Sequence, residues 1–147
     1  MLYSGLNRAN IALENIPKCN ITDETLLNTY LGEAYFLRAF FCYRLTTMFN
    51  APPLFTTNPK TEDYKKQKTT PQEAWFDQIK LDCQTAITLL PETWDKVNLG
   101  RATKGAAWAL LGKTYMEDEV WDSAEIAFNK LIVEKVGNYS LMTALGT

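Results

Sequence analysis

Apolar residues recur at intervals of three and four along most of the chain, a spacing that places them on one face of an α-helix. The first such stripe stops at Pro17, because proline cannot continue a helix. The second runs from Thr22 to Phe49 and is apolar on nearly every side in its C-terminal half, which predicts that this half is buried between neighbouring helices. The first stripe consists of Leu2, Leu6, Ala9, Leu13 and Ile16.

Residues typical of helix ends divide the next part of the chain. Thr22, followed by two acidic residues, is a preferred N-cap, and Asn50, just ahead of a pair of prolines, ends the long helix. Thr70 to Glu73 has the pattern of a capping box with proline at the first helical position. The segment between these signals, Leu54 to Thr69, has no helical period and is predicted to be a long surface loop.

Three helices are predicted after this loop, and no segment alternates in the manner of a strand. The first begins at Thr70, the second runs from Thr103 to about Glu117, and the third follows an acidic turn and is capped by Gly137. The predicted buried positions are Trp75, Ile79, Cys83, Ala86, Ile87 and Leu90 in the first of these helices and Ala124, Ala127, Phe128, Leu131 and Ile132 in the last.

Six residues match the tetratricopeptide repeat, a pair of antiparallel helices in about 34 residues. Gly112 and Ala124 are small where the two helices come closest, and larger side chains fill the space beside that contact. Because all six are core positions, they predict the architecture and leave the ligand open. The six are Trp108, Leu111, Gly112, Tyr115, Ala124 and Phe128.

A second, looser unit pairs the Thr22 to Phe49 helix with the helix that begins at Thr70, and the long loop is an insertion between them. We therefore predict an all-α fold of tetratricopeptide-like antiparallel helix pairs, wound as a right-handed α-α superhelix, in one domain over residues 1–147. Roughly three or more repeats are normally needed for stability. Two units and one flanking helix therefore lead us to expect that more chain follows.

The composition excludes several classes of function. The 147 residues carry a formal net charge of -2, so a basic face for nucleic acid is not expected. There is no histidine, which removes the commonest general base and the commonest zinc ligand, and we expect no catalytic group, metal or cofactor. Cys19, Cys42 and Cys83 lack a metal-binding spacing and are interpreted as structural.

An ordered series of short motifs resembles the SusD/RagB-type nutrient-binding lipoproteins of the Bacteroidetes outer membrane, and the resemblance spans most of the chain. In chain order the motifs are Glu33-Ala34-x-x-Leu37-Arg38-Ala39, Pro53-Leu54, Ile79 to Pro91, Gly100-Arg101-Ala102-Thr103, Trp121-x2-Ala124 and Gly137-Asn138-Tyr139-x-Leu141. Asn50 departs from the pattern, since the family often has glycine at that turn.

The resemblance implies a non-catalytic protein of the cell surface that captures an oligosaccharide or similar nutrient and delivers it to a SusC-like TonB-dependent transporter. The chain lacks the family's secretion signal, lipidated cysteine and larger C-terminal part. We therefore expect an N-terminal portion of a larger protein whose membrane contact is a lipid anchor absent from this chain. The alternative, from the repeats alone, is a cytoplasmic tetratricopeptide adaptor that binds a partner peptide in its concave face.

The loop after the long helix carries the main ligand-binding candidates, because its aromatic and amide groups are of the kind that stack on sugar rings and bind their hydroxyls. The alternative is a solvated connection whose aromatic residues pack on the helices. Trp94 and Arg44 are further ligand candidates, whereas Trp75 and Trp121 are predicted in the core, and Arg38 in a structural ion pair. The loop candidates are Asn50, Phe55, Asn58 and Tyr64.

Overall fold

The computed structural model describes residues 1–66, 68–137 and 139, and this part of the chain contains helices and loops but no strand. The all-α prediction is therefore confirmed. The elements are α1 (Leu2–Asn15), the 3-10 turn η1 (Ile16–Lys18), α2 (Glu24–Phe49), α3 (Thr61–Lys66), α4 (Gln72–Leu89), α5 (Lys104–Glu117) and α6 (Trp121–Ile132).

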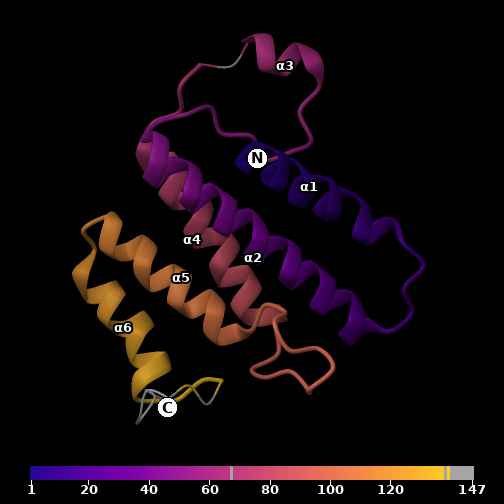
Figure 1. The fold of residues 1–147 in the computed structure, drawn as a ribbon, viewed down its shortest axis with the longest axis vertical. Coiled ribbons are helices and arrows are strands. Elements are labelled where there is room, and N and C mark those ends of the chain that lie inside the picture. The colour runs from indigo at the N-terminus through magenta and orange to yellow at the C-terminus, as the bar shows by residue number, and fades with distance from the viewer. Residues whose placement is uncertain (67, 138, 140–147) are drawn as a thin grey trace, which may run out of the picture.

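The five long helices pack one beside the next (Figure 1). Helix α2 packs against α1 and α4, α4 also packs against α5, and α5 packs against α6. The pairs α2–α4 and α5–α6 are the two predicted tetratricopeptide-like units, and α1 flanks the first. The α2–α4 connection, which carries α3, and the α4–α5 connection project from opposite ends of this stack.

Side chains from α1, α2, α4 and α5 form the main core. Trp75 is fully buried in it, and its indole nitrogen donates a hydrogen bond to the carbonyl of Pro52 at 3.0 Å. Burying a large apolar side chain contributes about 1.5–3 kcal/mol. The core residues that are buried are Leu6, Ala39, Cys42, Leu45, Trp75, Phe76, Ile79, Cys83, Leu110 and Leu111.

Two predicted N-caps are wrong. Asp23 rather than Thr22 caps α2, because its carboxylate accepts the Leu26 N–H at 3.1 Å. The capping box before α4 does not form, since the Thr70 hydroxyl accepts the Leu54 N–H at 3.0 Å instead. A tertiary contact to the preceding loop has therefore replaced the local contact that the sequence pattern predicts.

Two further boundaries differ from the prediction. The long loop contains the six-residue helix α3, whose first turn is supported by a hydrogen bond from the Lys60 N–H to the Asp63 carboxylate at 2.7 Å. Six residues are too few to show a helical stripe. The last helix ends at Ile132, with Val133 as its C-cap, so Gly137 does not cap it, although Gly137 has a positive φ of 87°.

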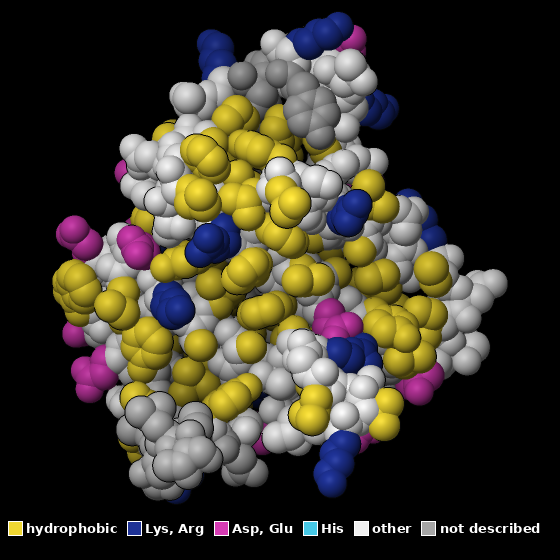
Figure 2. Space-filling model, viewed as in Figure 1, with side chains coloured by type: hydrophobic (Ala, Val, Ile, Leu, Met, Phe, Trp, Pro, Cys, Tyr) yellow, Lys and Arg dark blue, Asp and Glu magenta, His cyan; other side chains and the backbone are white. Residues whose placement is uncertain are grey.

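Some residues predicted to be buried are exposed. Trp121 is 62% exposed and Ile132 is 72% exposed, because α5 is the only one of the described helices that packs against α6, on the face that carries Ala124 and Ala127. The C-terminal half of α2 is also partly exposed, and Figure 2 shows hydrophobic side chains across the face formed by α2 and α5. The exposed apolar residues in this half of α2 are Leu37, Phe40, Met48 and Phe49.

The tetratricopeptide register is confirmed at the contact between α5 and α6. A Cβ atom at Gly112 would lie 2.8 Å from the Phe128 ring, so the two helices approach as closely as glycine permits. Ala124 is buried on the facing helix, and Trp108 and Tyr115 pack against the core beside Leu111.

Replacing Gly112 with leucine should force α5 and α6 apart and lower the free energy of unfolding by about 1–3 kcal/mol or more. The melting temperature followed by circular dichroism measures this loss. Lys113→Ala is the matched control, because Lys113 is the exposed neighbour on the same helix. A melting temperature equal to that of the parent protein would contradict the helix contact described above.

The three cysteines differ in accessibility. Cys42 and Cys83 are buried and free, as expected of small apolar core residues, whereas Cys19 is free and exposed. Burial raises the pKa of both buried thiols far above the ordinary value, so they remain protonated.

We expect a thiol reagent such as Ellman's reagent to modify Cys19 alone in the folded protein and all three cysteines in denaturant, since the thiolate is the nucleophile. Absorbance after each treatment counts the modified thiols. Fast modification of more than one cysteine without denaturant would show that the core is open, and Cys19→Ser should abolish the fast reaction.

Candidate functional site

The loop between α2 and α4 begins with a sharp turn at Asn50. This residue has a positive φ of 63°, which is uncommon for a residue other than glycine. The Asn50 N–H donates to the Thr46 carbonyl at 2.8 Å, and the Thr46 hydroxyl donates back to the Asn50 carbonyl at 2.7 Å. These two hydrogen bonds close the end of the helix, and the chain then turns toward α1.

The backbone of this loop is held by side chains of the surrounding helices. The Tyr3 hydroxyl donates to the Pro53 carbonyl at 2.6 Å, and the Trp75 indole donates to Pro52 as described above. The Asn10 amide nitrogen donates to the carbonyls of Phe55 and Thr57, at 3.0 and 2.9 Å. Three helices, α1, α2 and α4, contribute these donors, because Arg38 of α2 binds the Thr56 carbonyl at 2.9 Å.

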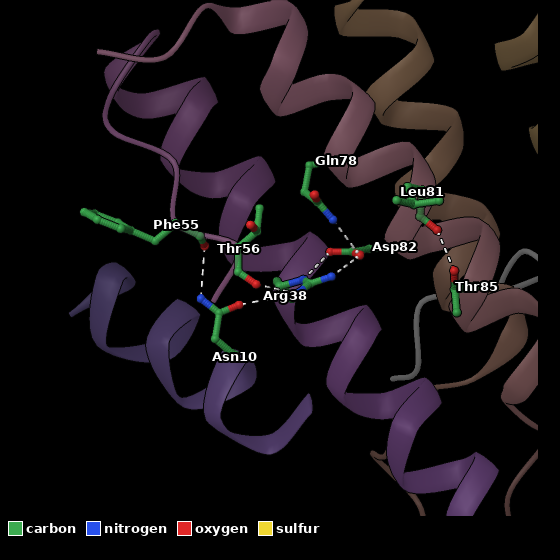
Figure 3. Close-up of polar contacts among 8 residues, drawn as sticks. All are labelled: Asn10, Arg38, Phe55, Thr56, Gln78, Leu81, Asp82 and Thr85. Carbon is green, nitrogen blue, oxygen red and sulfur yellow. Dashed lines mark hydrogen bonds and ion pairs between the residues drawn. The ribbon is translucent and has the colours of Figure 1, made fainter. Parts of the chain in front are cut away.

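Arg38 is the centre of this network (Figure 3). Its Nε and Nη2 atoms donate to the two carboxylate oxygens of Asp82 at 2.8 and 2.7 Å, which joins α2 to α4. Asp82 is fully buried and the Arg38 side chain is 11% exposed. Gln78 supplies a further hydrogen bond to Asp82 at 2.9 Å, so the carboxylate is well satisfied. The predicted structural role of Arg38 is confirmed.

Burial and pairing act in opposite directions on these two groups. Burial raises the pKa of the Asp82 carboxyl, and the hydrogen bonds from Arg38 and Gln78 oppose that shift. Burial lowers the pKa of the Arg38 guanidinium, but the hydrogen bond to Asp82 and the charge interactions with Asp82 and its other neighbours together outweigh this effect, and the pKa is raised overall. Each charge is therefore tolerated in the interior only while its partner is present.

The structure brings two of the four loop candidates to α1. The half-buried Phe55 ring packs edge-on against the Tyr3 ring, with the two ring centroids 6.1 Å apart. The Asn58 backbone N–H donates to the Glu14 carboxylate at 2.8 Å, and the Asn58 side chain is exposed. Asn50 is exposed at the end of α2, before the anchored part of the loop. Tyr64 belongs to α3, and its side chain lies outside the described residues.

Trp94 lies at the opposite end of the stack, in the α4–α5 connection. Its indole nitrogen donates to the Ala102 carbonyl at 2.7 Å, and the Arg101 guanidinium lies 4.1 Å from the ring centroid. Arg101 is itself held by both carboxylate oxygens of Glu33 at 2.7 and 2.9 Å. A recess of about 430 Å³ opens beside Trp94, but its indole is already engaged by the protein.

Arg44 lies apart from both the α2–α4 loop and the α4–α5 connection, so the six ligand candidates do not form one site. It is exposed on α2, where it lines a groove of about 290 Å³ together with Phe40 and residues of α5. Among the described residues, no group of three or more acidic, cysteine or histidine side chains is arranged to hold a metal ion. No helix within the same range is both long and apolar enough to cross a membrane.

Sequence reasoning missed the residues that hold the loop. Asn10 is a polar residue, but it is fully buried beside Ala9 on the apolar face of α1. Tyr3 lies next to Leu2, at the start of the same helix. A polar residue within a buried helix face signals a tertiary hydrogen bond, because an unpaired amide there is costly. The partners themselves are backbone carbonyls, and these leave no trace in the sequence.

The helix pairs and the anchored loop define a helical-repeat scaffold. The family model described as "starch-binding associating with outer membrane" matches residues 1–116. The chain therefore belongs to the SusD-like family of carbohydrate-binding proteins. The resemblance inferred from the ordered motifs is confirmed, except that Asn138 and Leu141 lie outside the described residues.

Individual relatives agree with this assignment. SusD-like protein P38 of Formosa agariphila is 30% identical to this chain, and the match covers 96% of this chain and 26% of P38. SusD-like protein P25 of the same organism is 23% identical, and the match covers 95% of this chain and 27% of P25. The chain thus spans about a quarter of the length of these curated relatives.

Solved structures show the same fold. A laminarin-binding SusD-like protein superposes with a TM-score of 0.85 at 29% identity, over 88% of this chain and 28% of its own. A SusD superfamily protein from Bacteroides vulgatus superposes with a TM-score of 0.85 at 29% identity, over 96% of this chain and 30% of its own.

Arg38→Met should lower the free energy of unfolding by about 3–5 kcal/mol, because it leaves the Asp82 carboxylate buried without a partner. The double variant Arg38→Met/Asp82→Leu should lose less, since no unpaired charge remains. Urea denaturation followed by circular dichroism measures both values. Equal losses in the single and double variants would show that the unpaired carboxylate carries no penalty.

Proposed function

We propose that this chain is the helical-repeat part of a non-catalytic glycan-binding protein at the outer-membrane surface, which delivers oligosaccharide to a SusC-like TonB-dependent transporter. The match of residues 1–116 to a family described as starch-binding and associated with the outer membrane carries this proposal. A laminarin-binding structural relative supports a glucan as the class of ligand. Family membership also favours this function over a cytoplasmic adaptor that binds a peptide.

We propose that the loop from Asn50 to Tyr64 contributes to glycan contact. Its backbone is tied to three helices, and a ligand that binds a preorganised loop loses little conformational entropy from the protein. Phe55 offers an aromatic ring beside Tyr3, and the exposed Asn58 amide offers both a donor and an acceptor for sugar hydroxyls. Trp94 and Arg44 are secondary candidates, because they lie apart from this loop and from one another.

A glycan array probed with the complete gene product that contains this chain tests whether it binds a glycan. Binding to a β-glucan or α-glucan is the expected result, and no binding to any glycan would overturn the proposal. Delivery to a transporter has an independent test in the genome. An adjacent reading frame for a TonB-dependent receptor and a lipoprotein signal in the parent reading frame are expected, and the absence of both would overturn that part.

Phe55→Ala/Asn58→Ala should weaken retention on native gels cast with laminarin or starch about fivefold or more, since a contact side chain that contributes about 1 kcal/mol changes affinity by that factor. The melting temperature should stay close to that of the parent, because the backbone hydrogen bonds of both residues remain. Lys60→Ala in the same loop is the control. Unchanged retention of the double variant would remove the loop from the glycan site.

A further inference from the structure

The scaffold holds the loop mainly through the loop's backbone, and the side chains of Leu54 and Phe55 pack on the helices as well. The carbonyls of residues 52, 53, 55, 56 and 57 each accept a hydrogen bond from a helix side chain. A backbone carbonyl is the same group in every residue, so these contacts place no demand on which side chain stands at each position. The exposed side chains of residues 56–58 are thereby left out of the anchoring.

Asn10 makes two of these contacts with one amide group. Its single amide nitrogen donates to the carbonyls of Phe55 and Thr57, on either side of Thr56, whose own carbonyl accepts from Arg38 Nη1. Three consecutive carbonyls are therefore fixed by two side chains. The Asn10 oxygen faces the same Arg38 Nη1 atom at 3.5 Å, so the buried Arg38–Asp82 pair backs the amide and sets its orientation.

We propose that Asn10, backed by Arg38, is the positioning residue of this loop, and that the side chains of residues 55–58 set which glycan is bound. This inference rests on the proposed function of the loop in glycan contact. The path of the loop then depends on α1 and α2, while its specificity depends on side chains of which the exposed ones, at residues 56–58, can be exchanged without moving that path. Asn10 acts through the backbone and does not itself contact the glycan.

Asn10→Asp separates this role from simple packing. The aspartate has nearly the same shape, so it leaves no cavity, but it replaces the amide donor with an acceptor that faces two carbonyl oxygens. Both loop hydrogen bonds are lost, while an oxygen remains to face Arg38. The matched control is Asn15→Asp, because Asn15 is an exposed residue of the same helix whose amide bonds only to the Ile11 carbonyl within that helix.

Limited trypsin digestion of the complete gene product measures how often the loop opens. Lys60 follows the anchored segment directly, and Lys96 in the α4–α5 connection is an exposed internal reference. When opening and closing are fast, cleavage follows the population of the open state. Loss of two hydrogen bonds predicts about tenfold faster cleavage after Lys60 in Asn10→Asp, with unchanged cleavage after Lys96, and no change at either site in Asn15→Asp.

Two results would overturn the positioning role. One is unchanged cleavage after Lys60 in Asn10→Asp, and the other is an equal acceleration at Lys60 and Lys96, which would indicate general destabilisation. Exchange of loop side chains gives the converse test: Thr56→Ala/Thr57→Ala should leave cleavage after Lys60 at the parent rate. Faster cleavage there would show that side chains, and not the backbone, set the path.

Retention on laminarin and starch gels completes the experiment and distinguishes this inference from the proposed function. Asn10→Asp should bind more weakly than Asn15→Asp, because an open loop presents its side chains in many positions. If the loop opens in Asn10→Asp and retention is unchanged, Asn10 positions a loop that does not contact the glycan, and the specificity assigned to residues 55–58 is overturned together with the loop's proposed function.

Discussion

The bidentate ion pair between Arg38 and Asp82 is the interaction on which this arrangement depends. It crosses the interface between α2 and α4 within the core, where either charge alone would be costly. The same guanidinium extends to the Thr56 carbonyl and to the Asn10 side chain, so one buried group joins α1, α2, α4 and the loop. Helix packing and loop conformation are therefore not independent in this protein.

Much of the fold could be predicted from the sequence, because helical periodicity and the small-residue contact at Gly112 are local patterns with a single structural solution. The helix ends were less predictable. Thr70 has the residue type for a cap, but its hydroxyl is used by the Leu54 N–H from the preceding loop. The prediction of burial at the edge of the stack was also wrong, since Trp121 has the residue type of a core position but none of the described helices covers it.

The geometry of the candidate site was predictable only in part, for a related reason. The exposed position of Asn58 follows from its place in a loop. The contacts that shape the loop connect side chains to carbonyl groups 18 to 50 residues away, and no residue pattern encodes them. Two of the family motifs contact each other in the fold, because Glu33 of one and Arg101 of the other form a bidentate ion pair. These motif residues stabilise the scaffold, which explains why they identify the family and do not identify the sugar.

The hydrogen bond from Trp75 to the Pro52 carbonyl gives the protein an internal optical probe. Trp75 is the one tryptophan of the described chain that is fully buried, whereas Trp121 is largely exposed and should emit at longer wavelength. The blue edge of the intrinsic emission is therefore weighted toward Trp75, although the half-buried Trp94 and Trp108 also contribute to the spectrum. Because the Trp75 indole is hydrogen-bonded to Pro52 at the start of the loop, a spectral shift on adding a sugar would report a change in the loop's position without any attached dye.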